Sequence, residues 1–148
     1  MRSARSIVVA LGLIACGGAE AEPEDSSVSF TSLMRGSSSV VAPGGAVVAR
    51  NQSELNAIWA KYFGHIGPKP PPPPAVDFNA HQVVGLFLGT RPNGCYSMSF
   101  TRVRRTNERL IVTYREQIYR GICTQSLVNP GQLIAVPQSQ LEVEFVPE

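Results

Sequence analysis

A strand covered by protein on both faces is predicted between His81 and Leu88. The run HQVVGLFL is apolar at both odd and even positions. Because successive side chains of a strand point to opposite faces, such a run indicates a strand at the centre of a sheet. The next segment, up to Tyr96, contains the residue types that a sharp reversal requires: Gly89, Pro92, Asn93 and Gly94. The pattern therefore predicts a central strand that presents a rigid turn.

Shorter strands are predicted on both sides of this strand. Apolar and polar residues alternate in the segments 28–33, 97–101, 110–115 and 141–145, which is typical of half-buried antiparallel strands. Short apolar runs at 40–41, 46–49 and 133–136 are bounded by proline and glycine and predict three more strands. The first strand is expected to end at Arg35-Gly36, and Pro130-Gly131 is expected to bound a loop.

One helix is predicted after Asn51, the residue expected to cap its N-terminus, with Glu54 three residues later reaching back as in a capping box. Apolar residues at helical spacing then form one face: Leu55, Ile58, Trp59, Tyr62 and Phe63. Gly64 is expected to end the helix, and the prolines at 70–74 predict an extended spacer. The expected fold is mainly β within the α+β class, an antiparallel sheet or small sandwich with this one amphipathic helix packed on it.

The N-terminus has the pattern of a bacterial lipoprotein signal peptide. Arg2 and Arg5 precede the apolar run IVVALGLI, which is shorter than the roughly 20 helical residues that span a bilayer. The sequence LIAC resembles a lipobox, which would make Cys16 the lipidated first residue of the mature protein. The alternative is an ordinary signal peptide cleaved near Ala19 or Ala21, with Cys16 lost.

Three segments follow from this interpretation: a signal peptide at 1–15, a flexible acidic tether from lipidated Cys16 at 16–27, and a β-rich domain at 28–148. The tether consists mainly of small and acidic residues and has almost no large apolar side chains. It therefore cannot bury enough apolar surface to offset the conformational entropy that it would lose on folding. Gly17 follows the cysteine where aspartate would indicate inner-membrane retention, which favours the outer membrane. We therefore expect an exported protein held on a membrane through lipid on Cys16.

The charge of the chain argues against nucleic acid as a partner. Arg2 and Arg5 account for the whole formal excess of two positive charges, since the chain has 13 Lys and Arg against 11 Asp and Glu. Arginines are dense between Arg102 and Arg120, where they are interpreted as solvated faces and strand-edge protection that also offer a contact surface.

Cys95 and Cys123 are the two cysteines that remain once Cys16 is assigned to lipid. In an exported protein such a pair predicts a disulfide. The competing hypothesis, a catalytic thiol, would need a histidine base, and only His65 and His81 are available.

The sequence lacks the common catalytic and metal-binding motifs. It contains no GxSxG, HExxH, P-loop or GxGxxG pattern, and its two histidines have no ligand spacing. We therefore expect a protein that is not an enzyme and uses no cofactor or metal.

A family resemblance rests on the order of several short motifs. They are Arg35-Gly36, the helix from Leu55 to Trp59, Asp77-Phe78, Leu88-Gly89, the turn of Arg91, Pro92, Gly94 and Tyr96, and Ile134 to Pro137. In this order the segment resembles the protease complex subunit PrcB family, specifically the PrcB C-terminal domain. Where that family has Gly-Gly-Tyr, this chain has Gly94-Cys95-Tyr96, so Cys95 would be strained if the position needs positive φ.

The resemblance implies a non-catalytic accessory domain of a surface protease complex. We accordingly expect the turn formed by Arg91, Pro92, Asn93, Gly94 and Tyr96 to contact a protein partner, a protease being one candidate. The alternative is a protease inhibitor that uses this turn as a wedge, because the turn is faintly similar to the glycine-tyrosine loop of chagasin-like inhibitors.

Overall fold

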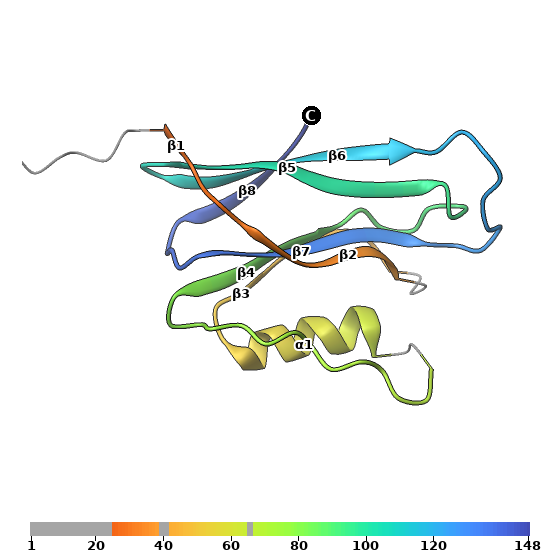
Figure 1. The fold of residues 1–148 in the computed structure, drawn as a ribbon, viewed down its shortest axis with the longest axis horizontal. Coiled ribbons are helices and arrows are strands. Elements are labelled where there is room, and N and C mark those ends of the chain that lie inside the picture. The colour runs from red at the N-terminus through yellow and green to blue at the C-terminus, as the bar shows by residue number, and fades with distance from the viewer. Residues whose placement is uncertain (1–24, 39–41, 65–66) are drawn as a thin grey trace, which may run out of the picture.

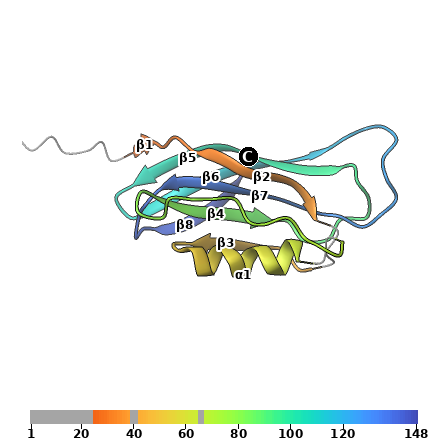
Figure 2. The same ribbon diagram turned by 60° about the horizontal axis from the view of Figure 1, so that its bottom comes forward.

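The computed structural model describes residues 25–38, 42–64 and 67–148. Two four-stranded sheets pack face to face, and the helix α1 covers the outer face of the second sheet (Figure 1, Figure 2). This confirms the prediction of a mainly β sandwich with one packed helix. The predicted lipid site, Cys16, lies outside the described residues.

The first sheet has the strand order β1-β5-β6-β8, formed by Asp25–Ser27, Tyr96–Thr106, Arg109–Ile118 and Glu142–Pro147 respectively. The second sheet has the order β2-β7-β4-β3, formed by Thr31–Ser38, Asn129–Pro137, His81–Phe87 and Gly45–Ala49. The helix α1 spans Gln52–Phe63. All pairs are antiparallel except β6 and β8, which are parallel.

Two hydrophobic clusters explain why β4 is apolar on both faces. Val84 faces the cluster between the sheets, together with Met98, Phe100, Val112 and Ile134. Its neighbour Val83 faces the cluster under the helix, which also holds Leu55, Tyr62, Phe63, Phe87 and Leu133. Burying each such side chain contributes about 1.5–3 kcal/mol. The predicted central strand is confirmed as an inner strand, and it shares that position with β7.

Both ends of α1 lie close to where the sequence predicts them. Asn51 Oδ1 accepts a hydrogen bond from the Glu54 amide at 2.9 Å, which confirms the N-cap. The Glu54 carboxylate reaches back one residue further than a capping box requires and accepts from the Arg50 amide at 2.6 Å. Gly64 is the C-cap residue, and Trp59 donates its indole N–H to the Pro71 carbonyl at 2.7 Å. The proline-rich segment is therefore fastened to the helix.

Three expected boundaries are wrong. The tether was expected to run to residue 27, but Asp25–Ser27 already form β1 against β5, supported by an ion pair between Asp25 and Arg104 at 2.6 Å. Polar side chains suit this exposed edge, so no apolar pattern marks it. Strand β2 continues through Arg35-Gly36 to Ser38, because β7 pairs with it along that length. The expected strand at 40–41 lies outside the described residues.

The third wrong boundary is Pro130-Gly131, which belongs to β7 rather than to a loop. The Pro130 carbonyl accepts from the Leu88 amide at 2.9 Å, so this residue takes part in the pairing although it has no N–H to donate. A Cβ on Gly131 would collide with the ring of Phe87, so glycine lets that buried ring pack against the strand.

Candidate functional site

The predicted partner-binding turn, residues 91–96, is tied to a second loop, residues 119–128. Arg91 and Val128 exchange backbone hydrogen bonds of 2.7 and 3.1 Å, and the Gly94 amide donates to the Thr124 carbonyl at 2.9 Å. A Cβ on Gly94 would overlap the Thr124 hydroxyl, so glycine permits this close approach. The two loops therefore form one rigid unit at the end of the β5–β6 hairpin.

A disulfide between Cys95 and Cys123 joins the same two loops, with their Cα atoms 5.3 Å apart. This confirms the predicted pairing. Cys95 is not strained, because no non-glycine residue in the described ranges has a positive φ. Its amide donates to Asn93 Oδ1 at 3.0 Å, which shows that the turn is held by a local side-chain bond as well.

The Arg91 side chain stabilises this unit of two loops through contacts within the chain. Its Nε lies 2.7 Å from Glu116 Oε1 on β6, and its Nη1 donates to the Leu88 carbonyl at 3.0 Å. The hydrogen bond to Glu116 raises the pKa of Arg91 above its ordinary value. About a quarter of the side chain, 26%, remains exposed. The guanidinium is thus committed to contacts within the chain.

The predicted turn residues differ in what they present to solvent. Pro92 and Gly94 are exposed, whereas Arg91, Asn93 and Tyr96 are half-buried. All five lie in one turn, as the sequence predicts, but only Pro92 and Gly94 are exposed rather than half-buried.

The end of β6 and the 119–128 loop carry the exposed apolar surface. Among the described residues, every large hydrophobic side chain that is exposed falls between positions 118 and 127: Ile118 at 60%, Tyr119 at 68%, Ile122 at 102% and Leu127 at 48%. We call these four residues the apolar tip. Single exposed apolar residues are ordinary on a surface, but exposed apolar residues grouped at one end of a domain make a candidate interaction surface.

Sequence reasoning missed the apolar tip. Ile122 and Leu127 stand in a polar loop, RGICTQSLVN, outside any period-2 or helical pattern that would bury them. Large apolar residues without such a pattern, close to a cysteine that anchors the loop, are the signal that could have identified this surface.

The structure gives the catalytic-thiol alternative no support. Both cysteines are engaged in the disulfide, so neither offers a thiolate. His81 begins β4, whereas His65 lies outside the described residues. Within the described ranges no three His, Cys, Asp or Glu side chains are grouped so that they could hold a metal ion.

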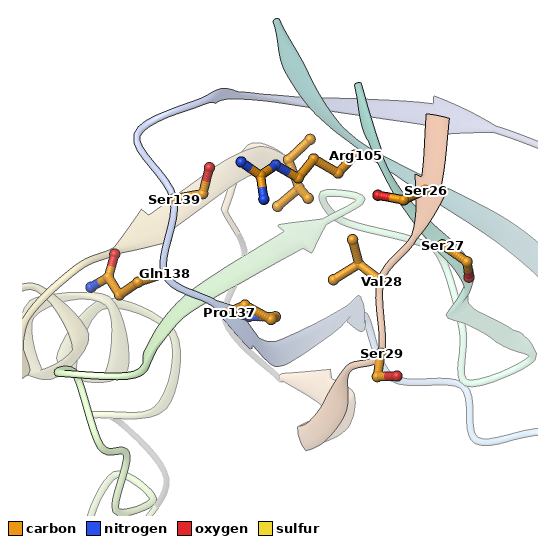
Figure 3. Close-up of a pocket in the computed structure, with 9 residues that line it drawn as sticks. Ser26, Ser27, Val28, Ser29, Arg105, Pro137, Gln138 and Ser139 are labelled. Carbon is orange, nitrogen blue, oxygen red and sulfur yellow. The ribbon is translucent and has the colours of Figure 1, made fainter. Parts of the chain in front are cut away.

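A cavity of about 270 Å³ lies at the opposite end of the β5–β6 hairpin (Figure 3). It is lined by Ser26–Ser29, Arg105, Leu110 and Pro137–Ser139, and the Arg105 side chain extends across it toward Ser139. Its lining has hydroxyls, a guanidinium and an amide but no carboxylate, imidazole or thiol. It therefore lacks the base that a nucleophilic serine would require.

Several arginines of the 102–120 segment are paired with acids across the first sheet. Arg104 contacts Asp25, Arg109 contacts Glu144 at 2.8 Å and Arg115 contacts Glu148 at 2.8 Å. The hydrogen bond to Glu144 raises the pKa of Arg109. These pairs agree with the interpretation of the arginines as solvated strand faces, and they reduce the charge available to an anionic partner.

Comparison with known proteins adds no relative: no family model, no curated protein and no solved structure matches the chain. The resemblance to the PrcB C-terminal domain therefore stays a prediction from the motifs alone.

Proposed function

We propose that this protein is an exported lipoprotein that binds another protein through the apolar tip and acts as a non-catalytic accessory subunit. The observation that carries the proposal is that, in the described ranges, the exposed large hydrophobic side chains are confined to residues 118–127, at the end of β6 and on the loop fixed by the Cys95–Cys123 disulfide. A rigid loop loses little conformational entropy when it binds, so more of the free energy of its apolar contacts contributes to the binding affinity.

Membrane attachment through Cys16 is the second part of the proposal. Its support is the lipobox pattern that ends the signal peptide, and the acidic segment that follows would set how far the domain reaches from the membrane. No helix in the described part of the chain is both long and apolar enough to cross a bilayer. The outer membrane remains the proposed location, on the identity of Gly17.

The resemblance to the PrcB family is what favours a protease complex as the partner. The inhibitor hypothesis has less support, because Arg91 is held by Glu116 and only Pro92 and Gly94 of the five turn residues are exposed. A wedge built from the turn alone would present little side-chain surface to an active-site cleft.

The proposal is tested by the size of the native complex. Membranes are solubilised in mild detergent, and the full chain is compared with the variants Ile122→Asp and Asn107→Asp by native electrophoresis. Asn107 is exposed in the turn at the other end of the hairpin, so it controls for the added charge. The proposal expects Ile122→Asp alone to migrate at the size of the free protein. Equal migration of all three chains would contradict it.

A further inference from the structure

The last part of β6 has an open edge. Strand β8 pairs with β6 only from Arg109 to Tyr114, and the final ladder bond runs from the Glu148 amide to the Tyr114 carbonyl at 2.8 Å. Within the residues that the structure describes, nothing pairs with β6 on that side between Arg115 and Ile118. Figure 1 shows the C-terminal end near the middle of the long β5–β6 hairpin, which continues toward the 119–128 loop.

The outward direction of the backbone groups follows from alternation along β6. The Tyr119 amide donates to the Cys95 carbonyl, so this residue faces β5, whereas the Tyr114 carbonyl faces β8. In an antiparallel pair the direction alternates from residue to residue. Glu116 and Ile118 therefore turn their N–H and C=O groups away from β5, toward the open edge.

The opposite strand confirms this assignment. Phe100 is the register partner of Tyr114, and its amide donates away from β6, to Gln132 Oε1 at 2.7 Å. Tyr114 and Phe100 thus form a pair whose backbone groups point outward on both strands. Two residues further on, Glu116 repeats the same orientation, and Ile118 follows.

Two of the charges beside this edge have partners within the chain. The Arg115 guanidinium contacts Glu148 at 2.8 Å, and the Glu116 carboxylate contacts Arg91 at 2.7 Å. Edge strands commonly use charged side chains to repel other strands, but here each of the two charges has an internal partner. The side chains that continue along the edge, Ile118 and Tyr119, are apolar and exposed. A neutral, apolar occupant fits this edge.

We propose that the partner contributes an extended, uncharged peptide segment, apolar at alternate positions, that adds as a strand beside Glu116–Ile118. This inference rests on the proposed function and specifies how the partner binds. Main-chain hydrogen bonds to the two outward-facing residues give affinity, and alternate side chains select the sequence. The peptide side chains on the inner face of the sheet would lie against Ile118 of the apolar tip, as cross-strand neighbours do.

The first test uses peptides on the full chain in detergent. Random peptides of about ten residues, the length of a long strand, are selected by phage display. Amide exchange is then measured with the best synthetic peptide bound. We expect apolar residues at i, i+2 and i+4 in the selected peptides and slower exchange at the Glu116 and Ile118 amides. Peptides with helical spacing, or binding without protection of these amides, would overturn the proposal, as would a dimer of this chain that protects them without peptide.

The second test separates the backbone from the side chain at one position. Ile118→Ala removes the side chain and keeps the outward N–H, whereas Ile118→Pro removes that N–H at an edge position where proline is tolerated. The expected loss of peptide affinity is about tenfold or more greater for proline than for alanine, the size of one lost hydrogen bond. Equal losses would contradict strand addition. If the Ile122→Asp variant still loses its complex while the edge amides stay unprotected, strand addition fails and the proposed function stands.

Discussion

Arg91 and Glu116 form an ion pair, with 2.7 Å between Nε and Oε1, that fastens the 91–96 turn to β6. The sequence predicts that Arg91 faces a partner. In the structure its side chain instead stabilises the position of the two loops beside the apolar tip. Under the proposed function, Arg91 contributes to recognition only by holding its neighbours in position.

Replacing Arg91 should therefore reduce stability. Arg91→Ala removes the contacts with Glu116 and the Leu88 carbonyl, and we expect a loss of about 1 to 2 kcal/mol, measured by urea denaturation. Arg102→Ala is the matched control, because Arg102 is exposed on β5, and it should change stability by less than about 0.5 kcal/mol. Equal losses of stability from the two substitutions would show that the Arg91 contacts do not stabilise the fold.

The Cys95–Cys123 disulfide should supply a large share of the stability. It closes a segment with a sequence separation of 28 residues, which corresponds to about 3 to 4 kcal/mol on the chain-entropy model. The double variant Cys95→Ala, Cys123→Ala should unfold at a correspondingly lower urea concentration than the oxidised protein. An unchanged midpoint would mean that the hydrogen bonds between the loops hold them without the disulfide.

Lipidation is tested by the intact mass of the protein purified from membranes. A chain that begins at Cys16 and carries acyl chains is the expected species, and Cys16→Ser should remain unlipidated and leave the membrane fraction. An unmodified chain that begins after Ala19 or Ala21 would instead show an ordinary signal peptide.

The parts of the fold that follow local rules could be predicted from the sequence. The central strand at 81–87 is marked by its two apolar faces, and α1 by its capping residues and apolar stripe. The disulfide followed from the number of cysteines and the predicted compartment. In each case the signal lies within a short segment or in a simple count.

The parts that depend on distant partners could not be predicted. The alternation in β8 identifies a strand but not its parallel pairing with β6, because the choice of neighbour depends on the whole sandwich. Asp25–Ser27 form a strand only because β5 offers an edge there. The apolar tip was missed because exposure is set by the absence of neighbours, which the periodic patterns that predict strands and helices do not record.

The central claim is that the apolar tip contacts a protein partner, and site-specific photo-crosslinking in intact cells tests it most directly. The photoreactive residue p-benzoyl-phenylalanine is placed at position 122 in one chain and at position 107 in another, both exposed and at opposite ends of the β5–β6 hairpin. The account predicts one discrete crosslinked product from position 122 and none from position 107. The same products from both positions, or a product from position 107 alone, would contradict it.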